Sequence, residues 1–326
     1  GLLLETLQHL RNTDLGMQSE KLLTFETPLF RYQDFDRRVA FVNAELESIR
    51  AIPGVLHAGA ISRIPLTVND QATFYLLAGQ SLVGQPGEPP PGQVAIFRVV
   101  TRDYFQTIGA RLREGRFFEI SDRRSESPVV IVNESFANLN FAGRSPLGAR
   151  FKFGQLDEKG YWYTIVGVVQ DMRDRGVTEE LEPTVYLLHE QTDQWSTKGA
   201  QPSGIVVRTA VEPASIVSAI RHAISSVDKN QPIWRVQTLE EIVNRQLSTP
   251  TQSTALMNAF ALLALLLASI GLYGVLSYAV AQRTNEIGVR MALGATSSEI
   301  LLSFVKRGLA LTLTGLAIGL ALSGHA

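Results

Sequence analysis

One stretch, LMNAFALLALLLASIGLYGVLSY at residues 256–278, decides the architecture of this chain. It lies within 37 consecutive residues, 246–282, that contain no Asp, Glu, Lys or Arg. As a helix, its 23 residues reach about 34 Å, and a membrane's hydrocarbon core is about 30 Å thick. A buried helix of a soluble protein usually keeps a polar stripe, and a signal peptide lies at the N-terminus. We therefore predict a membrane-spanning helix over about 256–278.

Two other apolar segments suggest further spans. Residues 308–326 form a second uncharged run, which we interpret as a partial span. Its Gly315-x-x-x-Gly319 step is a candidate site for helix packing. Residues 1–4, GLLL, resemble the end of an earlier span, so residues 1–19 are predicted to be the end of a first transmembrane helix and a connector. We accordingly expect the chain to be a fragment of a longer protein.

The basic residues predict the orientation. Arg283, Arg290, Lys306 and Arg307 lie between the two runs, whereas only Arg245 lies in the 20 residues before position 256. Short loops rich in Lys and Arg lie on the cytoplasmic side. We therefore expect the loop 283–307 to be cytoplasmic and residues of about 20–250 to lie outside the cytoplasm.

The outer domain, about 20–250, is predicted to be α+β. Residues 21–29 suit a strand, apolar residues between 35 and 49 recur at helical spacing, and 55–62 suit a second strand. The same order returns with a strand at 204–208, a helix opened by Pro213 and a strand at 233–236. We expect these two β-α-β units to form two packed halves.

A β-rich second lobe is predicted between them. Residues 80–92, with four Pro and three Gly, form an irregular connector. Strands are expected at 94–100, 129–132 and 163–169, and Asn133 is expected to cap a short helix. The mixed-sign segments 122–124 and 170–175 are predicted to be solvated loops.

Composition excludes several kinds of chemistry. The chain has 30 basic and 31 acidic residues, whereas nucleic-acid-binding chains usually have a basic excess. It has no cysteine, and its five histidines show no metal-ligand spacing, so we predict neither a metal site nor a cofactor. The dipeptide Gly-Lys is absent, which excludes a P-loop within these residues. No motif for a catalytic nucleophile is present, and we predict a non-catalytic protein.

The loop after residue 282 carries the candidate functional residues. Residues 286–292 can form a short amphipathic helix on the membrane surface, with Ile287 and Met291 one turn apart. Gly288 and Gly294 permit close approach or a sharp turn.

Residues 283–295, RTNEIGVRMALGA, resemble the loop between two spans of MacB/FtsX-type ABC transporter permeases. Several segments of the outer domain resemble the MacB-like periplasmic core domain of that family, in the same order: 52–55, 62–66, 104–109, 115–116, 129–134, 145–148 and 166–171.

The resemblance implies a permease that transmits conformational change from a cytoplasmic ABC ATPase, on a separate chain, to a periplasmic domain at the bacterial inner membrane. It implies a porter-like part built of β-α-β units, a second lobe, and an FtsX-like membrane domain over 251–326. The loop is the coupling helix in that family, and the positions that match it are Arg283, Glu286, Ile287, Gly288, Arg290, Ala292, Leu293, Gly294 and Ala295.

The implied partners are the ATPase, a second permease copy or half, membrane lipid, and a periplasmic adaptor or outer-membrane partner, but no nucleic acid. The alternative is a membrane-anchored extracytoplasmic sensor or scaffold that binds a ligand. A membrane enzyme is disfavoured because no nucleophile or metal pattern is present. An ATPase reading frame beside the gene favours the permease, and a kinase or cyclase frame favours the sensor.

Overall fold

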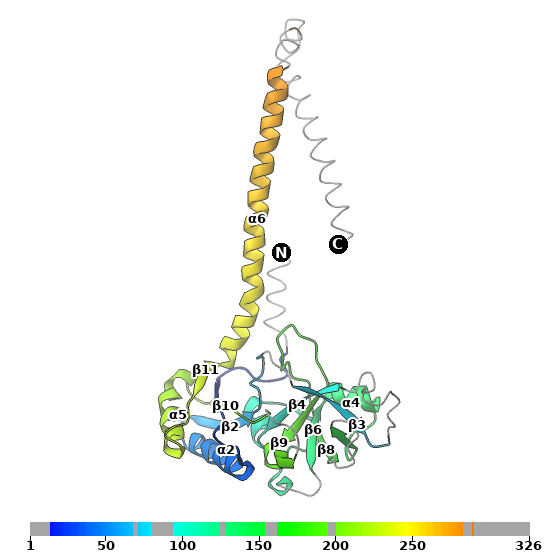
Figure 1. The fold of residues 1–326 in the computed structure, drawn as a ribbon, viewed down its shortest axis with the longest axis vertical. Helices are drawn as coiled ribbons and strands as arrows, with labels where there is room; N and C mark the ends of the chain where they lie inside the picture. Colours follow the sequence, from blue (N-terminus) through cyan, green and yellow to red (C-terminus); the bar gives the residue numbers. More distant parts are fainter. Residues whose placement is uncertain are drawn as a thin grey trace. The chain divides into compact units, whose positions relative to one another are not determined.

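Eleven strands form one continuous hydrogen-bonded sheet in the part of the chain that the computed structural model describes (Figure 1). That part comprises residues 14–67, 71–79, 94–123, 128–153, 162–194, 200–282 and 289. The chain divides into two units, Gly1–Thr249 and Pro250–Ala326. The sheet belongs to the first unit, and its strands form two lobes.

The first lobe interleaves two β-α-β units. Its strand order is β11-β1-β10-β2, and β10 pairs antiparallel with both β1 and β2. The two strands of each unit are therefore parallel and have a strand of the other unit between them, an arrangement known as a split β-α-β. The elements are β1 (Leu22–Glu26), α2 (Phe35–Arg50), β2 (Val55–Ile61), β10 (Gly204–Thr209), α5 (Pro213–Val227) and β11 (Trp234–Thr238).

The predicted α+β class is confirmed, and the structure changes how its two units combine. We predicted two packed halves, but the strands of both units share one sheet. Strand β10 lies between β1 and β2, and β1 lies between β10 and β11. The two units therefore share one sheet and one core. In α5, Ile216, Ile220 and Ile224 are buried.

The second lobe is inserted between β2 and β10, and its sheet closes on itself. Six strands pair in the ring β4-β3-β7-β8-β6-β9, and β9 returns to β4 as a parallel neighbour. A closed ring leaves no unpaired strand edge. Its elements are β3 (Ala72–Leu77), β4 (Val94–Val100), α3 (Tyr104–Ile108), β5 (Leu112–Gly115), η1 (Ile120–Asp122), β6 (Val129–Asn133), α4 (Glu134–Phe141), β7 (Arg150–Phe153), β8 (Tyr163–Val169), β9 (Thr184–Leu188) and η2 (His189–Gln194).

Most predicted elements of this lobe are confirmed. The strands expected at 94–100, 129–132 and 163–169 are β4, β6 and β8. Asn133 caps α4, because its side-chain oxygen accepts from the Phe136 amide at 3.0 Å. The short strands β3, β5, β7 and β9 were not predicted. The connector at 80–92 lies outside the described residues.

Three apolar clusters hold the domain together. One lies under α2 and α5. A second lies in the closed six-stranded ring of the second lobe, which we call the barrel, and includes Phe151 and Val185. The third joins strands of both lobes and includes Leu239. Successive side chains of β1 point to opposite faces of the sheet, so Leu22 belongs to the third cluster and Leu23 to the first.

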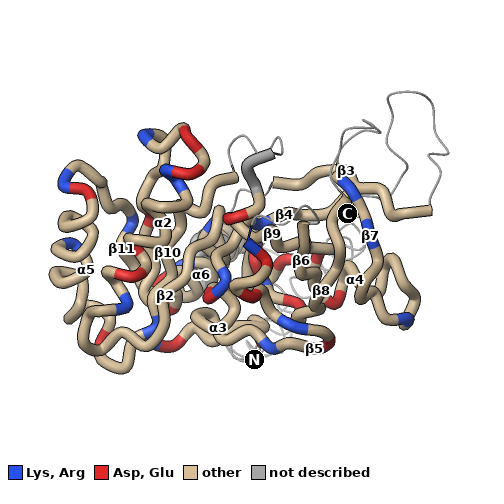
Figure 2. The backbone as a smooth tube through the Cα atoms, turned by 90° about the horizontal axis from the view of Figure 1, so that it is seen from below, with Lys and Arg blue, Asp and Glu red and all other residues tan. Residues whose placement is uncertain are grey.

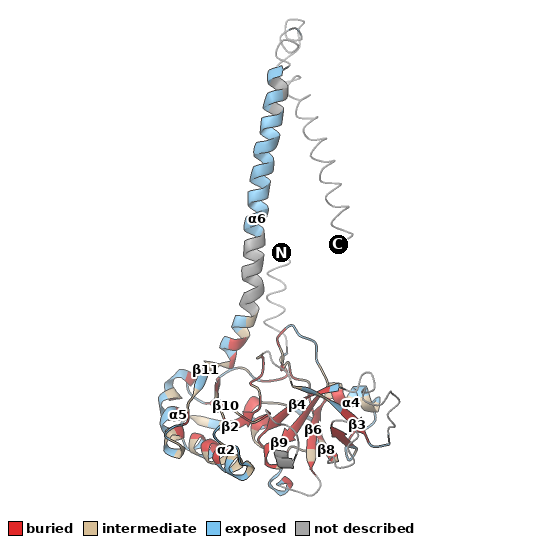
Figure 3. Cartoon of the chain, viewed as in Figure 1, coloured by how far each residue is buried: buried red, intermediate tan, exposed pale blue. Residues whose placement is uncertain are grey.

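Helix α6 (Leu239–Gln282) is continuous over 44 residues. Its segment Asn258–Val275 has a mean hydropathy of 2.0 and no buried residues, so its length and composition suit a membrane span (Figure 3). It overlaps the predicted span 256–278. The expected first span, the loop 283–307 except Val289, and the expected span 308–326 lie outside the described residues.

Charged residues of both signs are interspersed over the first unit (Figure 2), but Glu45 of α2 is fully buried. The Thr27 hydroxyl donates to Glu45 Oε2 at 3.1 Å, and Glu45 Oε1 has no hydrogen-bond partner in the described part of the chain. Burial raises the pKa of Glu45 from 4.5 to about 8. The side chain is therefore protonated at neutral pH in the folded domain.

We expect Glu45→Gln to flatten the pH dependence of stability. Between pH 4.5 and about 8 the folded wild type keeps the Glu45 proton that the unfolded chain loses. The bound proton stabilises the folded state fully below pH 4.5. This stabilisation falls by about 1.4 kcal/mol for each pH unit as the pH rises from 4.5 to about 8, and it is lost above pH 8. Thermal unfolding of E45Q should match the wild type near pH 4 and exceed it at pH 9. The exposed Glu47→Gln on the same helix is the control, and parallel profiles for E45Q and wild type would contradict the expectation.

Candidate functional site

The predicted coupling residues lie outside the described part of the chain. This applies to Arg283, Glu286, Ile287, Gly288, Arg290, Ala292, Leu293, Gly294 and Ala295, and to the helix-packing residues Gly315 and Gly319. Val289 alone in this loop is described, and its backbone is helical. The candidate site that the structure does describe is the junction where α6 begins on the first unit.

The sequence itself starts α6 sharply at this junction. The Glu241 amide donates to the Thr238 hydroxyl at 3.1 Å, and the Thr238 amide donates to Glu241 Oε2 at 2.8 Å. This reciprocal capping box satisfies two backbone donors at the start of the helix. The first turn then buries Leu239 and Ile242 in the cluster that joins the two lobes. The base of α6 is therefore part of the domain core.

One side chain of α6 ties the helix to two other segments. The Gln246 carboxamide oxygen accepts from the Val177 amide at 2.9 Å, and its NH₂ group donates to the Leu66 carbonyl. The Leu66 amide in turn donates to the Asp174 carbonyl at 2.7 Å. Leu66 has a φ of +63°, a conformation that non-glycine residues rarely adopt. These bonds hold Leu66 between α6 and residues 170–177, which we call the hub loop.

The hub loop also binds the segment that precedes β1, residues 14–21. The Arg173 amide donates to the Leu15 carbonyl at 3.0 Å, and the Gln170 side chain donates to the Gly16 carbonyl. Gly16 has a φ of +72°, and a Cβ atom there would lie 2.0 Å from the Asp171 carbonyl oxygen. Only glycine fits this contact.

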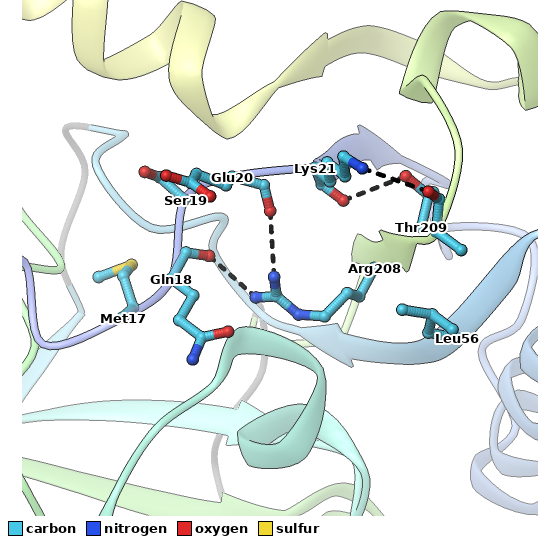
Figure 4. A pocket seen from close by; sticks show the side chains of 9 residues that line it. Met17, Gln18, Ser19, Glu20, Lys21, Leu56, Arg208 and Thr209 are labelled. Carbon is cyan, nitrogen blue, oxygen red and sulfur yellow. Dashed lines mark hydrogen bonds between the residues drawn. The ribbon is translucent and has the colours of Figure 1, made fainter.

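Arg208 fixes the same segment from β10. Its guanidinium donates to the carbonyls of Gln18 at 2.9 Å and Glu20 at 3.0 Å (Figure 4). It also donates to the Thr107 carbonyl at 2.7 Å. Burial lowers the pKa of Arg208, but the group stays protonated at neutral pH. Arg208 therefore acts here as a clamp on the backbone, and it lines an open pocket of about 660 Å³ together with Met17, Lys21 and Leu56.

Buried charge anchors the hub loop to the second lobe. The Tyr186 hydroxyl of β9 donates to Asp174 Oδ2 at 3.1 Å. Burial raises the pKa of both Tyr186 and Tyr104 well above its ordinary value; the negative charge of Asp174 adds to this rise, and the positive charge of Arg98 opposes it. Asp174, Arg98 and the two phenols thus form one buried polar group. An unpaired charge at this depth would be costly, so removing one member should disturb the others.

The hub loop also positions α4 of the second lobe, through Asp171. The Asp171 carboxylate accepts from the Ser135 amide at 2.9 Å and from the Ser135 hydroxyl at 2.8 Å. A carboxylate at a helix N-terminus is favourable because it faces unpaired backbone amides. The hub loop consequently contacts α4, β9, residues 14–21, Leu66 and α6.

The prediction of solvated loops is wrong for residues 170–175 and for Asp122, whereas Arg123 is exposed and residue 124 lies outside the described residues. Asp122, Gln170 and Asp174 are each buried, with 5 or 6% of their surface exposed. Arg116 neutralises Asp122 through two hydrogen bonds of 2.6 and 2.8 Å, which hold the pKa of Asp122 below its ordinary value against the opposing effect of burial. Mixed charge in a short segment does not reveal whether partners elsewhere in the chain will bury it.

Sequence reasoning missed the junction as a site. The pattern Thr238-x-x-Glu241 was a visible signal for the start of α6. No signal identified Gln246, Leu66 or Gly16, because each acts through contacts with distant residues. Within the described ranges, no group of three His, Asp or Glu side chains is placed to hold a metal ion. The junction consists of hydrogen bonds and apolar packing.

Comparison with known families identifies the chain. Residues 8–227 match the model of the MacB-like periplasmic core domain, and residues 258–324 match that of the FtsX-like permease C-terminal region. The chain belongs to the MacB/FtsX family of ABC transporter permeases. MacB/FtsX proteins reside in the inner membrane and have periplasmic domains, and the two matches cover both parts.

Similar MacB proteins are known from several bacteria. The macrolide export ATP-binding/permease protein MacB of Rhodospirillum rubrum is 26% identical over 314 residues, which cover 88% of this chain and 46% of the relative. The protein of the same name from Neisseria gonorrhoeae is 26% identical over 231 residues, covering 69% of this chain and 34% of the relative. The chain thus spans about a third to a half of the curated relatives it matches.

Two solved structures are also similar. The periplasmic region of MacB from Actinobacillus actinomycetemcomitans aligns with a TM-score of 0.47 and 15% identity, covering 74% of this chain and 96% of that one. The extracellular domain of the ABC-type transporter YknZ from Gram-positive bacteria aligns with a TM-score of 0.43 and 15% identity, covering 67% and 99%.

We expect Gly16→Ala to loosen residues 14–21 from the hub loop. The new methyl group meets the Asp171 carbonyl at 2.0 Å in addition to the strain of a positive φ. Gly79→Ala is the matched control, because its φ is +86° but nothing lies within 4 Å of the new atom. G16A should lower the thermal unfolding midpoint more than G79A and expose residues 14–21 to limited proteolysis. Equal effects of the two variants would show that the close contact is unimportant.

Proposed function

We propose that this chain is the permease part of an ABC-type export or mechanotransmission system. In this proposal ATP binding by a cytoplasmic ATPase moves the loop 283–307, α6 carries the movement across the membrane, and the outer domain, residues of about 20–250, responds in the periplasm. The orientation rests on the basic residues of the loop. The domain limits are 1–19 for the first helix end and connector, 20–250 for the periplasmic core and 251–326 for the membrane domain.

The observation that carries the proposal is the attachment of α6 to the hub loop. Gln246 bonds to Val177 and Leu66, and Leu239 and Ile242 pack in the core that joins the lobes. Residues 14–21, which follow the proposed first span, bind the same loop through Leu15 and Gly16. Both membrane-linked segments therefore bear on one short loop, and displacement of either one strains contacts of the other.

The proposed partners follow from the family. A cytoplasmic ABC ATPase supplies the energy, and a second permease copy or half completes the membrane part, with Gly315 and Gly319 as candidate packing residues. The ATP-binding part is proposed to lie outside these 326 residues, which contain no P-loop; the relatives' names combine ATP binding and permease in one protein. A periplasmic adaptor or outer-membrane protein is the proposed recipient of the movement.

The alternative is a membrane-anchored sensor or scaffold that binds a ligand in the outer domain. The described part of the domain has two recesses, so ligand binding is compatible with either function. A sensor needs a signalling partner in place of an ATPase. Co-purification from the native membrane distinguishes the two, since an ATPase supports the permease and a kinase or cyclase supports the sensor. A reconstituted transport assay that compares a macrolide with a peptide then addresses the cargo.

We expect Glu286→Ala with Arg290→Ala to weaken binding of the ATPase. Both residues match the coupling helix of the family, and their charges are the proposed contacts, together with Arg283. Full-length protein should capture less ATPase in a pull-down, and ATPase activity should no longer respond to the permease. Lys306→Ala, in the same loop, is the control for loss of a basic residue. Unchanged capture and coupled activity in the double variant would overturn the assignment.

We expect Gln246→Leu to separate ATPase binding from coupling. Leucine is similar in size but makes neither bond to Val177 and Leu66, and a buried amide that loses its partner costs about 1–3 kcal/mol. The variant should bind ATPase normally yet show transport reduced several-fold for each ATP hydrolysed. Asn244→Leu alters an exposed position of the same helix and should retain coupling. Normal coupling in Q246L would show that the junction does not transmit the movement.

A further inference from the structure

A second recess of the first lobe has no part in the junction described above. It measures about 180 Å³ and lies at the edge of the sheet where β1 and β2 end and β10 and β11 begin. Because β10 and β11 run antiparallel to β1, the four strands bring their polar ends to this edge. Six of the lining residues are polar: Glu26, Ser62, Arg63, Thr67, Ser203 and Arg235.

The recess has an excess of positive charge. Arg235 Nη1 lies 3.0 Å from Glu26 Oε1, so these two charges offset each other. Arg63 is the second guanidinium in the lining, and no ion pair of this side chain occurs within the described ranges. An anion is therefore the ligand that the charges favour.

Arg63 also has a hydrogen-bond donor in need of an acceptor. Its Nε atom is buried and has no hydrogen-bond partner among the residues that the structure describes. A buried donor without an acceptor is unfavourable, and native proteins usually satisfy it with water or a ligand. The Ser62 hydroxyl lies in the same lining and accepts from the Val99 amide at 3.1 Å, which leaves its proton available. Both side chains line the recess, so each brings a hydrogen-bond donor group to its wall.

The size of the recess limits the ligand. A volume of about 180 Å³ equals about six water molecules. Pockets for drug-sized molecules usually measure about 300–1,000 Å³. A carboxylate or phosphate group fits, whereas a macrolide ring does not.

The loop that lines the recess also reaches α6. Arg63 and Thr67 flank Leu66, whose amide bonds to Asp174 and whose carbonyl accepts from Gln246. The Thr67 amide and hydroxyl both donate to the Ile64 carbonyl, so residues 64–67 form one hydrogen-bonded turn. A ligand held by Arg63 thus stiffens the turn that fixes the base of α6.

We propose that this recess binds one oxyanion group, a carboxylate or phosphate of a small soluble ligand, through Arg63 and Ser62, and that occupancy is passed to α6 through Leu66 and Gln246. The binding step stands independently of the proposed transport function. The second step rests on that function, since it gives the ligand a means of regulating the coupling helix.

Thermal unfolding of the full chain in an uncharged detergent tests the binding. Sodium phosphate, sodium acetate and sodium chloride are titrated at equal ionic strength. Either phosphate or acetate should raise the unfolding midpoint beyond the chloride series and approach saturation, as expected for a ligand of the folded state. Arg63→Gln should weaken the effect at least about tenfold, and Arg63→Lys should restore part of it because lysine keeps the charge but not the planar donors. Arg37→Gln, an exposed arginine of α2, should behave as wild type.

Two results would overturn the binding proposal: no shift beyond chloride in the wild type, or an equal shift in R63Q. A phosphate-only response assigns a phosphate group, and an acetate-only response assigns a carboxylate. Hydrogen exchange tests the second step. The effective anion should slow exchange over residues 62–67 and 239–246 in the wild type, but only over 62–67 in Gln246→Leu. Unchanged exchange over 239–246 in the wild type would overturn the link to α6 and leave the binding result intact.

Discussion

The connection between the outer domain and helix α6 depends on the backbone amide and carbonyl of Leu66. Its amide donates to Asp174 in the hub loop, and its carbonyl accepts from Gln246 in the helix. The residue holds a positive φ of 63°, a strained conformation that persists only when surrounding contacts enforce it. Those contacts come from the hub loop and α6, so both segments must be in place for the residue to adopt its conformation.

The hub loop extends this constraint to the rest of the domain. Asp171 caps α4, Asp174 bonds to Tyr186 of the barrel, and Gln170 holds Gly16. Each contact is short, polar and at least partly buried, and such contacts are strongly directional because their partners cannot be replaced by solvent. The apolar cluster around them supplies stability, while the polar bonds fix the relative positions of residues 14–21, the two lobes and the base of α6.

The barrel and the first lobe differ in how their strands end. Closure of six strands leaves the barrel without unpaired strand edges, and aromatic residues such as Phe151 and Tyr163 belong to its buried apolar cluster. The first lobe keeps an edge of the sheet at which strand ends from both β-α-β units meet, and that edge carries the recess around Arg63. Its polar lining is a consequence of topology, because antiparallel neighbours place the end of one strand beside the beginning of the next.

Local patterns in the sequence determined the regular elements and the character of α6. Helical spacing predicted α2, Pro213 marked the start of α5 and Asn133 that of α4, because each of these signals acts between residues close in sequence. The uncharged run predicted a helix apolar enough for a membrane, since that property is a sum over adjacent side chains. Only the tertiary structure decided that the two β-α-β units interleave, that the second lobe closes on itself, and that Asp122, Gln170 and Asp174 are buried. The roles of Leu66 and Gln246 likewise arise from a bond between residues 180 positions apart, and a polar residue carries no local sign of whether such a partner will meet it.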